Sequence, residues 1–198
     1  MRPMKLAPVC LAVLFAVGPS AVLSLQASGT QTAAGWTTLF DGSNLNNWNP
    51  IGTANWRLAD GGVEATSGTG FLVSKASYTD FELRLEVWVD PAANSGVFIR
   101  CSNPMEVTAM NSYEVNIFDM RPDPAYRTGA IVNVAKPMSM VNAGNRWNTL
   151  EIAAKGPRLT VRLNGMPMVD VQDTMHARGP IALQYGTGTV KFRNVQIR

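Results

Sequence analysis

The feature that most constrains the fold of this chain is a two-residue alternation of apolar and polar side chains, which recurs beyond Trp36. Between Phe81 and Val89 every second residue is apolar, and the residues between them are charged except for Trp88. A period of two places alternate side chains on opposite faces of a strand. Apolar residues at helical spacing are missing from this region, so the pattern predicts a fold built almost entirely of strands.

Turn signals separate the alternating segments and keep each of them short. These signals are Asp60-Gly61-Gly62, Pro91-Ala92-Ala93-Asn94, Gly156-Pro157, Asn164-Gly165 and Arg178-Gly179-Pro180. About a dozen strands, each with one apolar face, predict an all-β, antiparallel β-sandwich. The sequence has no internal repeat that would indicate a propeller or a solenoid. We expect one domain over residues 36–198.

The N-terminus has the pattern of a secretory signal peptide. Arg2 and Lys5 precede an apolar run over residues 6–17, which is too short to span a bilayer, and small residues follow it. We predict a signal peptide over residues 1–24 and a flexible lead-in over residues 25–35, and therefore a secreted or periplasmic protein with no membrane span after cleavage. An uncleaved anchor is the alternative.

The charge of the chain argues against a polyanionic partner. The formal net charge is +3, from 17 basic and 14 acidic residues, but two of the basic residues lie in the predicted signal. The remaining chain is almost neutral and has no run of like charges, so we expect no nucleic-acid partner, and this charge suits a small neutral molecule. Cys10 also falls in the signal, which leaves Cys101 without a disulfide partner. The oligomeric state stays open.

Several short blocks, in order along residues 36–198, together resemble one family. They include Leu39-Phe40-Asp41-Gly42, Asp60-Gly61-Gly62-Val63, Asn94-Ser95-Gly96-Val97-Phe98-Ile99-Arg100, Tyr113-Glu114-Val115-Asn116-Ile117 and Trp147-Asn148-Thr149-Leu150-Glu151-Ile152. The set resembles the 3-keto-disaccharide hydrolase domain family (DUF1080). The resemblance implies a concanavalin A-like jelly roll, an exported bacterial protein, and activity on sugars whose C3 hydroxyl has been oxidised to a ketone.

The implied chemistry assigns roles to two residues of the strongest blocks. A C3 ketone acidifies the C2 hydrogen, so the glycosidic bond can break by proton abstraction and elimination, followed by hydration. Such a route needs a base and a partner for the developing oxyanion. We expect Glu114 to be the base, provided that burial raises its pKa toward neutrality, and Arg100 to be the oxyanion partner.

Further side chains are predicted to bind the sugar, because hydroxyls need polar partners and sugar ring faces stack on aromatic rings. They are Asn116, Phe98, Trp88, Lys136, Tyr185 and Asp119. Tyr185 follows Leu183-Gln184, where many proteins of the family carry a histidine, and the single histidine of this chain, His176, is expected at the surface. No cofactor is required, but a divalent cation such as calcium is a further hypothesis, with oxygen ligands from Glu114 and Asp119.

Two alternatives remain open. A non-catalytic carbohydrate-binding module would use the same face of the sheet and the same aromatic residues. A glycosidase with two catalytic carboxylates would need Glu82 or Glu86 within reach of Glu114 on one face.

Overall fold

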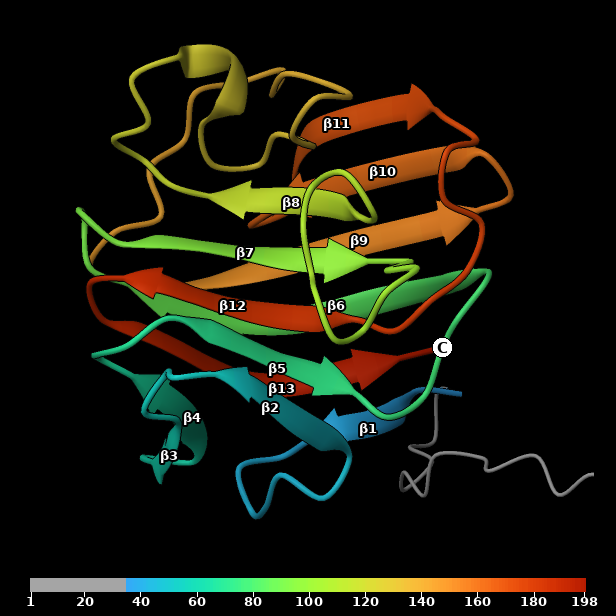
Figure 1. The fold of residues 1–198 in the computed structure, drawn as a ribbon. Helices are drawn as coiled ribbons and strands as arrows, with labels where there is room; N and C mark the ends of the chain where they lie inside the picture. The colour runs from blue at the N-terminus through green and yellow to red at the C-terminus, as the bar shows by residue number, and fades with distance from the viewer. Residues whose placement is uncertain (1–34) are drawn as a thin grey trace, which may run out of the picture.

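The computed structural model describes residues 35–198 (Figure 1). The predicted signal peptide at residues 1–24, and residues 25–34 of the predicted lead-in, lie outside the described residues. Within the described part of the chain, no helix has the length and apolar character needed to cross a membrane.

Two antiparallel sheets pack face to face, as the alternation predicts (Figure 1). The front sheet has the order β2-β5-β12-β7-β8, and the back sheet has the order β11-β10-β9-β6-β13-β4-β3, with β1 also pairing with β13. The front strands are β2 (Trp48–Gly52), β5 (Gly70–Ser74), β7 (Asn94–Ile99), β8 (Tyr113–Ile117) and β12 (Ala182–Thr187). The back strands are β1 (Thr37–Phe40), β3 (Arg57–Ala59), β4 (Gly62–Ala65), β6 (Phe81–Val89), β9 (Trp147–Lys155), β10 (Arg158–Leu163), β11 (Met166–Gln172) and β13 (Val190–Ile197). Among residues 35–198 the one helical element is the 3-10 turn η1 (Pro124–Tyr126).

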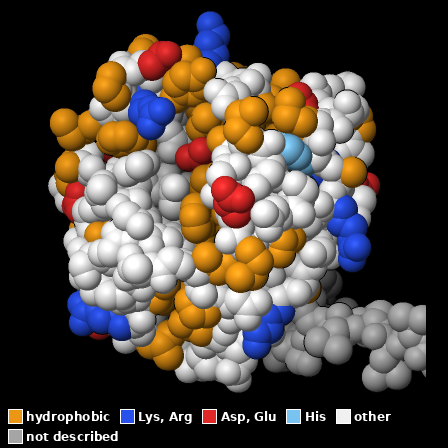
Figure 2. Space-filling model, viewed as in Figure 1, with side chains coloured by type: hydrophobic (Ala, Val, Ile, Leu, Met, Phe, Trp, Pro, Cys, Tyr) orange, Lys and Arg blue, Asp and Glu red, His pale blue; other side chains and the backbone are white. Residues whose placement is uncertain are grey.

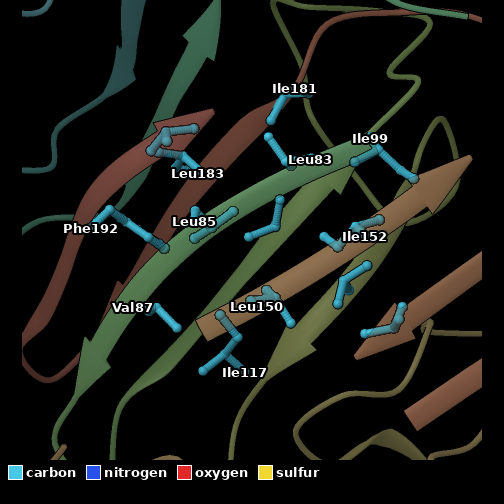
Figure 3. Close-up of a cluster of buried hydrophobic side chains, with 14 of the residues drawn as sticks. Leu83, Leu85, Val87, Ile99, Ile117, Leu150, Ile152, Ile181, Leu183 and Phe192 are labelled. Carbon is cyan, nitrogen blue, oxygen red and sulfur yellow. The ribbon is translucent and has the colours of Figure 1, made fainter. Parts of the chain in front are cut away.

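The core lies between the inner faces of the two sheets (Figure 3). Leu83, Leu85 and Val87 of β6 are fully buried, and they alternate with the partly or fully exposed Glu82, Arg84 and Glu86. From the front sheet, Ile99, Ile117 and Leu183 meet them across the interface. The predicted alternation is therefore confirmed for both sheets.

The predicted Asn-Gly turn joins β10 to β11. Asn164 and Gly165 both have positive φ angles, 53° and 78°, as the tight turn of a two-residue hairpin requires. Asparagine tolerates this backbone region better than most residues, and glycine adopts it freely.

Two long loops cover the ends and one face of the front sheet. We call residues 101–112, between β7 and β8, the covering loop, which arches in front of β7 and β12 in Figure 1. We call residues 118–146, between β8 and β9, the edge loop. Its residues 129–132 run beside β8, where the Asn116 amide donates to Ala130 O at 3.0 Å and the Val132 amide donates to Glu114 O at 3.0 Å.

Candidate functional site

The outer face of the front sheet brings residues from three strands into two neighbouring rows, with the polar ones on β8 and β12. Strand pairing places Ala182, Phe98 and Glu114 side by side in one row. In the adjacent row it places Gln184, Gly96 and Asn116 side by side. Apolar side chains gather over this face, with acidic side chains among them and basic ones toward its rim (Figure 2).

The covering loop closes part of the first row. Val107 and Cys101 pack on Phe98, whose ring is only 2% exposed and makes an edge contact with Phe71 at 5.3 Å between centroids. The prediction that Phe98 stacks on a sugar is therefore wrong, because the loop covers its ring. Phe71 on β5 remains partly exposed beside Gln184, its cross-strand partner, and is the aromatic surface that a sugar can contact.

Glu114 meets the condition set for a general base at neutral pH. Burial at the boundary of β8 and the edge loop raises the pKa of its carboxyl to about 7, and the positive charge of Arg121 opposes this rise. Taking a carboxylate out of water without a partner disfavours its charged form. At neutral pH the Glu114 carboxyl can therefore accept or donate a proton.

The edge loop holds Arg121 near this carboxylate. The Arg121 guanidinium lies over the rings of Phe118 and Tyr126, 5.8 and 5.9 Å from their centroids. Asn116 fixes that part of the loop, because its side-chain amide donates to Tyr126 O. Asn116 is thus a positioning residue for the loop that carries the cation.

Two amide oxygens beside Gly96 have no hydrogen-bond partner in the described structure, Oδ1 of Asn116 and Oε1 of Gln184. A buried acceptor without a donor costs about 1–3 kcal/mol. A Cβ on Gly96 would lie 3.4 Å from Gln184 Oε1 and 3.3 Å from the Phe98 ring, so the glycine leaves room between these groups. The two oxygens are therefore buried acceptors without a donor, just below the surface of this face.

Arg100 does not share this face, so the prediction that it pairs with Glu114 is wrong. Its backbone has a φ of 53°, which breaks the alternation at the end of β7, and its side chain is 2% exposed. The guanidinium donates to Thr79 O at 2.8 Å, Gly156 O at 2.8 Å and His176 O at 3.3 Å, and it bridges Asp80 at 3.2 Å. Arg100 joins three loops at one end of the sandwich.

Trp88 lies on the other outer face of the molecule. It belongs to β6 of the back sheet, where it pairs with Trp147 of β9, and Lys191 lies 5.5 Å from its ring centroid. The prediction that it binds sugar together with Glu114 is therefore wrong. Glu82 and Glu86 occupy the same back face, and each forms ion pairs there. The alternative of two catalytic carboxylates fails, because Glu114 is on the opposite sheet.

Tyr185 is a core residue, which contradicts its predicted role. It is 3% exposed, its hydroxyl donates to Gly188 O at 2.9 Å, and its ring meets the edge of Trp56. His176 is half-buried against Tyr113, at 4.8 Å between ring centroids, and burial lowers its pKa. His176 is partly exposed in the loop between β11 and β12, so the predicted surface position is confirmed in part.

Asp119 has a structural role in place of the predicted ligand-binding one. Its carboxylate accepts hydrogen bonds from the Thr128 hydroxyl and from the amides of Ala143 and Gly144, which closes the edge loop on itself. Residues 35–198 contain no group of three or more His, Cys, Asp or Glu side chains arranged to hold a metal ion. Lys136 is exposed in the edge loop, four residues beyond the Val132 amide that bonds to Glu114 O.

Three residues that sequence reasoning missed complete the site: Gln184, Phe71 and Arg121. The alternation does signal Gln184, because the buried Leu183 and Tyr185 on either side require it to point outward. Phe71 gives a similar signal between Gly70 and the buried Leu72. Arg121 has no such signal, since its position depends on the path of a long loop.

Comparisons with known proteins identify the family and the fold of this chain. A family model described as a 3-keto-alpha-glucoside-1,2-lyase-like domain matches residues 35–198. A solved structure of a candidate glycosyl hydrolase from Parabacteroides distasonis ATCC 8503 is 26% identical, with a TM-score of 0.71 over 82% of this chain and 98% of that one. The carbohydrate-binding module CBM66 of Bacillus subtilis is 20% identical, with a TM-score of 0.61 over 77% of this chain and 95% of that one. The sandwich is thus a concanavalin A-like jelly roll, as the sequence predicts.

A curated relative, the levanase of Bacillus subtilis (strain 168), is 22% identical over 164 residues. That match covers 81% of this chain but only 24% of the levanase, so this chain spans about a quarter of that relative's length.

Proposed function

Because the chain belongs to the family of 3-keto-alpha-glucoside-1,2-lyase-like domains, we propose that it cleaves the glycosidic bond of 3-keto glycosides, with Glu114 as the catalytic base. The observation that carries this proposal is the half-buried carboxylate of Glu114, whose pKa is raised to about 7 by its partial burial. The signal peptide predicted at residues 1–24 would place the activity outside the cytoplasm.

The proposed reaction has two stages. Glu114 takes the C2 proton, and the electron pair of the C2–H bond forms a C2–C3 double bond while the C3 oxygen becomes an oxyanion. When the C3 carbonyl forms again, a C1–C2 double bond forms with it, and the C1–O bond breaks as the leaving sugar takes up a proton. Water then adds across the C1–C2 bond and returns a proton to C2, so the net result is hydrolysis.

The residues near Glu114 can supply the oxyanion partner and the sugar-binding groups that this route needs. Arg121 is the cation that acts on Glu114, and it takes the role of oxyanion partner that the sequence had assigned to Arg100. Asn116 and Gln184 lie on either side of Gly96, and their side-chain amides are the proposed partners of sugar hydroxyls there. Lys136 remains a proposed substrate contact in the edge loop, and a divalent cation such as calcium remains a proposed ligand of the site.

The proposal is tested by incubating the protein with 3-ketotrehalose in D2O, with trehalose as the matched control. We expect glucose release from the keto sugar alone, and deuterium at C2 of the 3-ketoglucose product. Because the product can also exchange at C2 by itself, 3-ketoglucose without protein serves as the exchange blank. Cleavage of trehalose at the same rate, or cleavage without deuterium above the blank, would contradict the elimination route.

The pH dependence of the reaction follows from the pKa of Glu114. A base must be deprotonated, so kcat/KM is expected to fall about tenfold per pH unit below pH 7 and to level off above it. Initial rates between pH 5 and 9 measure this profile. In Arg121→Gln the midpoint should move to higher pH, because the positive charge that favours the carboxylate is removed. A rate that rises as the pH falls would contradict the assignment of Glu114 as a base.

A carbohydrate-binding module without catalytic activity is the second candidate. The likeness of the fold to CBM66 and the partly exposed Phe71 beside Gln184 favour it. It predicts sugar binding that survives Glu114→Gln, together with no turnover of any keto sugar by the unmodified protein.

A further inference from the structure

A recess lies beyond the covering loop, away from Glu114. Its volume is about 450 Å³, and its walls come from the end of β5, the start of the covering loop and the segment before β12. Cys101 separates it from the Glu114 face, because this residue lines the recess and also packs in the cluster that contains Phe98.

The backbone around this recess is held by hydrogen bonds between segments distant in sequence. Tyr78 and Gly179 exchange two of them, at 2.9 and 3.1 Å. The Ser74 amide donates to Ile181 O at 2.7 Å, and the Ile181 amide donates to the Ser74 hydroxyl at 2.9 Å. Gly179 also lies directly against Cys101, where a Cβ would meet Cys101 O at 2.1 Å. The walls are therefore fixed relative to one another.

The charge of the recess is unbalanced. Lys75 and Arg178 line it, and none of its lining residues is acidic. Within residues 35–198, neither cation lies within 4.0 Å of a carboxylate oxygen, although Lys155, Arg158 and Arg193 elsewhere on the molecule all form ion pairs. Ser77 adds a hydroxyl to the same walls, whereas the hydroxyl of Ser102 donates to Asn111 O at 3.2 Å.

The thiol of Cys101 adds no compensating negative charge. Burial raises the pKa of this thiol, so it stays protonated at neutral pH. The recess thus combines two exposed cations, the Ser77 hydroxyl and a neutral thiol on a fixed backbone frame. Arginine and lysine side chains in such a setting bind oxyanions through charge-assisted hydrogen bonds.

We propose that this recess binds an oxyanion group, such as a sulfate, phosphate or carboxylate group, and that Lys75 and Arg178 hold it. The group can be a free ion or a substituent of a saccharide, because the recess opens to solvent. This site does not depend on Glu114 or on the proposed reaction, since the covering loop and Cys101 stand between them.

Calorimetric titration at low ionic strength tests the site with four ligands: sodium sulfate, sodium phosphate, glucose 6-sulfate and glucuronate, with glucose as the neutral control. We expect at least one anion to bind while glucose does not, and Arg178→Gln or Lys75→Gln to weaken that binding about tenfold or more. Arg162→Gln, an exposed arginine on β10, is the matched control and should bind as the unmodified protein does.

The four ligands also distinguish the two sources of the group. Tighter binding of glucose 6-sulfate or glucuronate than of the inorganic ions identifies a saccharide substituent, and the reverse order identifies a free ion. Anion binding that is unchanged in the double variant Lys75→Gln/Arg178→Gln, or no binding of any of the four anions, would overturn the proposal. Cleavage of the neutral 3-ketotrehalose should be unaffected by either variant, so the failure of this site and of the proposed function can be told apart.

Discussion

Replacing Glu114 by glutamine is expected to lower kcat/KM for 3-keto glycosides by about 10²- to 10⁴-fold, the range that a positioned general base contributes. Glutamine keeps the shape of the side chain on β8 but cannot accept the C2 proton. Glu86→Gln removes a carboxylate from the back sheet and should leave the rate within about twofold, because Glu86 bonds to Arg193 and Asn194 far from this face.

The same substitution should also make the protein more stable above pH 7. Burial raises the pKa of Glu114 from 4.5 to about 7, so the folded protein bears a growing penalty as the pH rises from 4.5 toward 7. Glutamine bears no such penalty. The gain in unfolding free energy should therefore be near zero at pH 4 and about 3 kcal/mol at pH 8.

Urea unfolding at both pH values, measured beside the kinetics, separates a catalytic role from a structural one. If Glu114 is a catalytic base whose burial lowers the stability of the fold, the Glu114→Gln protein should be less active and more stable than the unmodified protein. Glu114→Gln protein that keeps more than a tenth of the activity, or that is less stable at pH 8, would contradict the assignment.

The alternation of the sequence predicts most of the fold but not which outer face a residue occupies. Trp88 does point away from the core, as its place in β6 predicts. A sandwich has two outer faces, however, and the order of strands within the sheets decides which one a strand contributes to. That order depends on contacts between segments distant in sequence, such as β6 with β9 and β13.

Two other wrong predictions have local causes. Tyr185 alternates in register with the buried Leu183, so the pattern itself places it in the core, and only the family resemblance placed it in the site. Arg100 shares the register of Phe98 but follows the last residue of β7, where a positive φ turns the chain and its side chain. The alternation therefore predicts the direction of a side chain only for residues within the strand.

Replacing Arg100 by methionine should destabilise the fold by about 3 kcal/mol without removing a catalytic group. The substitution deletes the hydrogen bonds to Thr79 O and Gly156 O and leaves those carbonyls without this donor. For a domain of this size, the loss corresponds to a fall in Tm of roughly 6–12 °C. Arg162→Met, at an exposed position on β10, is the matched control and should change stability by less than about 0.5 kcal/mol.

Kinetics of the folded Arg100→Met protein decide between the two roles considered for this residue. Measured well below its Tm, the variant should keep kcat within about threefold of the unmodified value and should keep the pH midpoint near 7. An oxyanion partner would behave in the opposite way, because its removal lowers kcat by about 10²- to 10³-fold with the fold intact. That outcome would support a catalytic role for Arg100. Its guanidinium would then have to break its hydrogen bonds to the carbonyls of Thr79, Gly156 and His176 during the reaction.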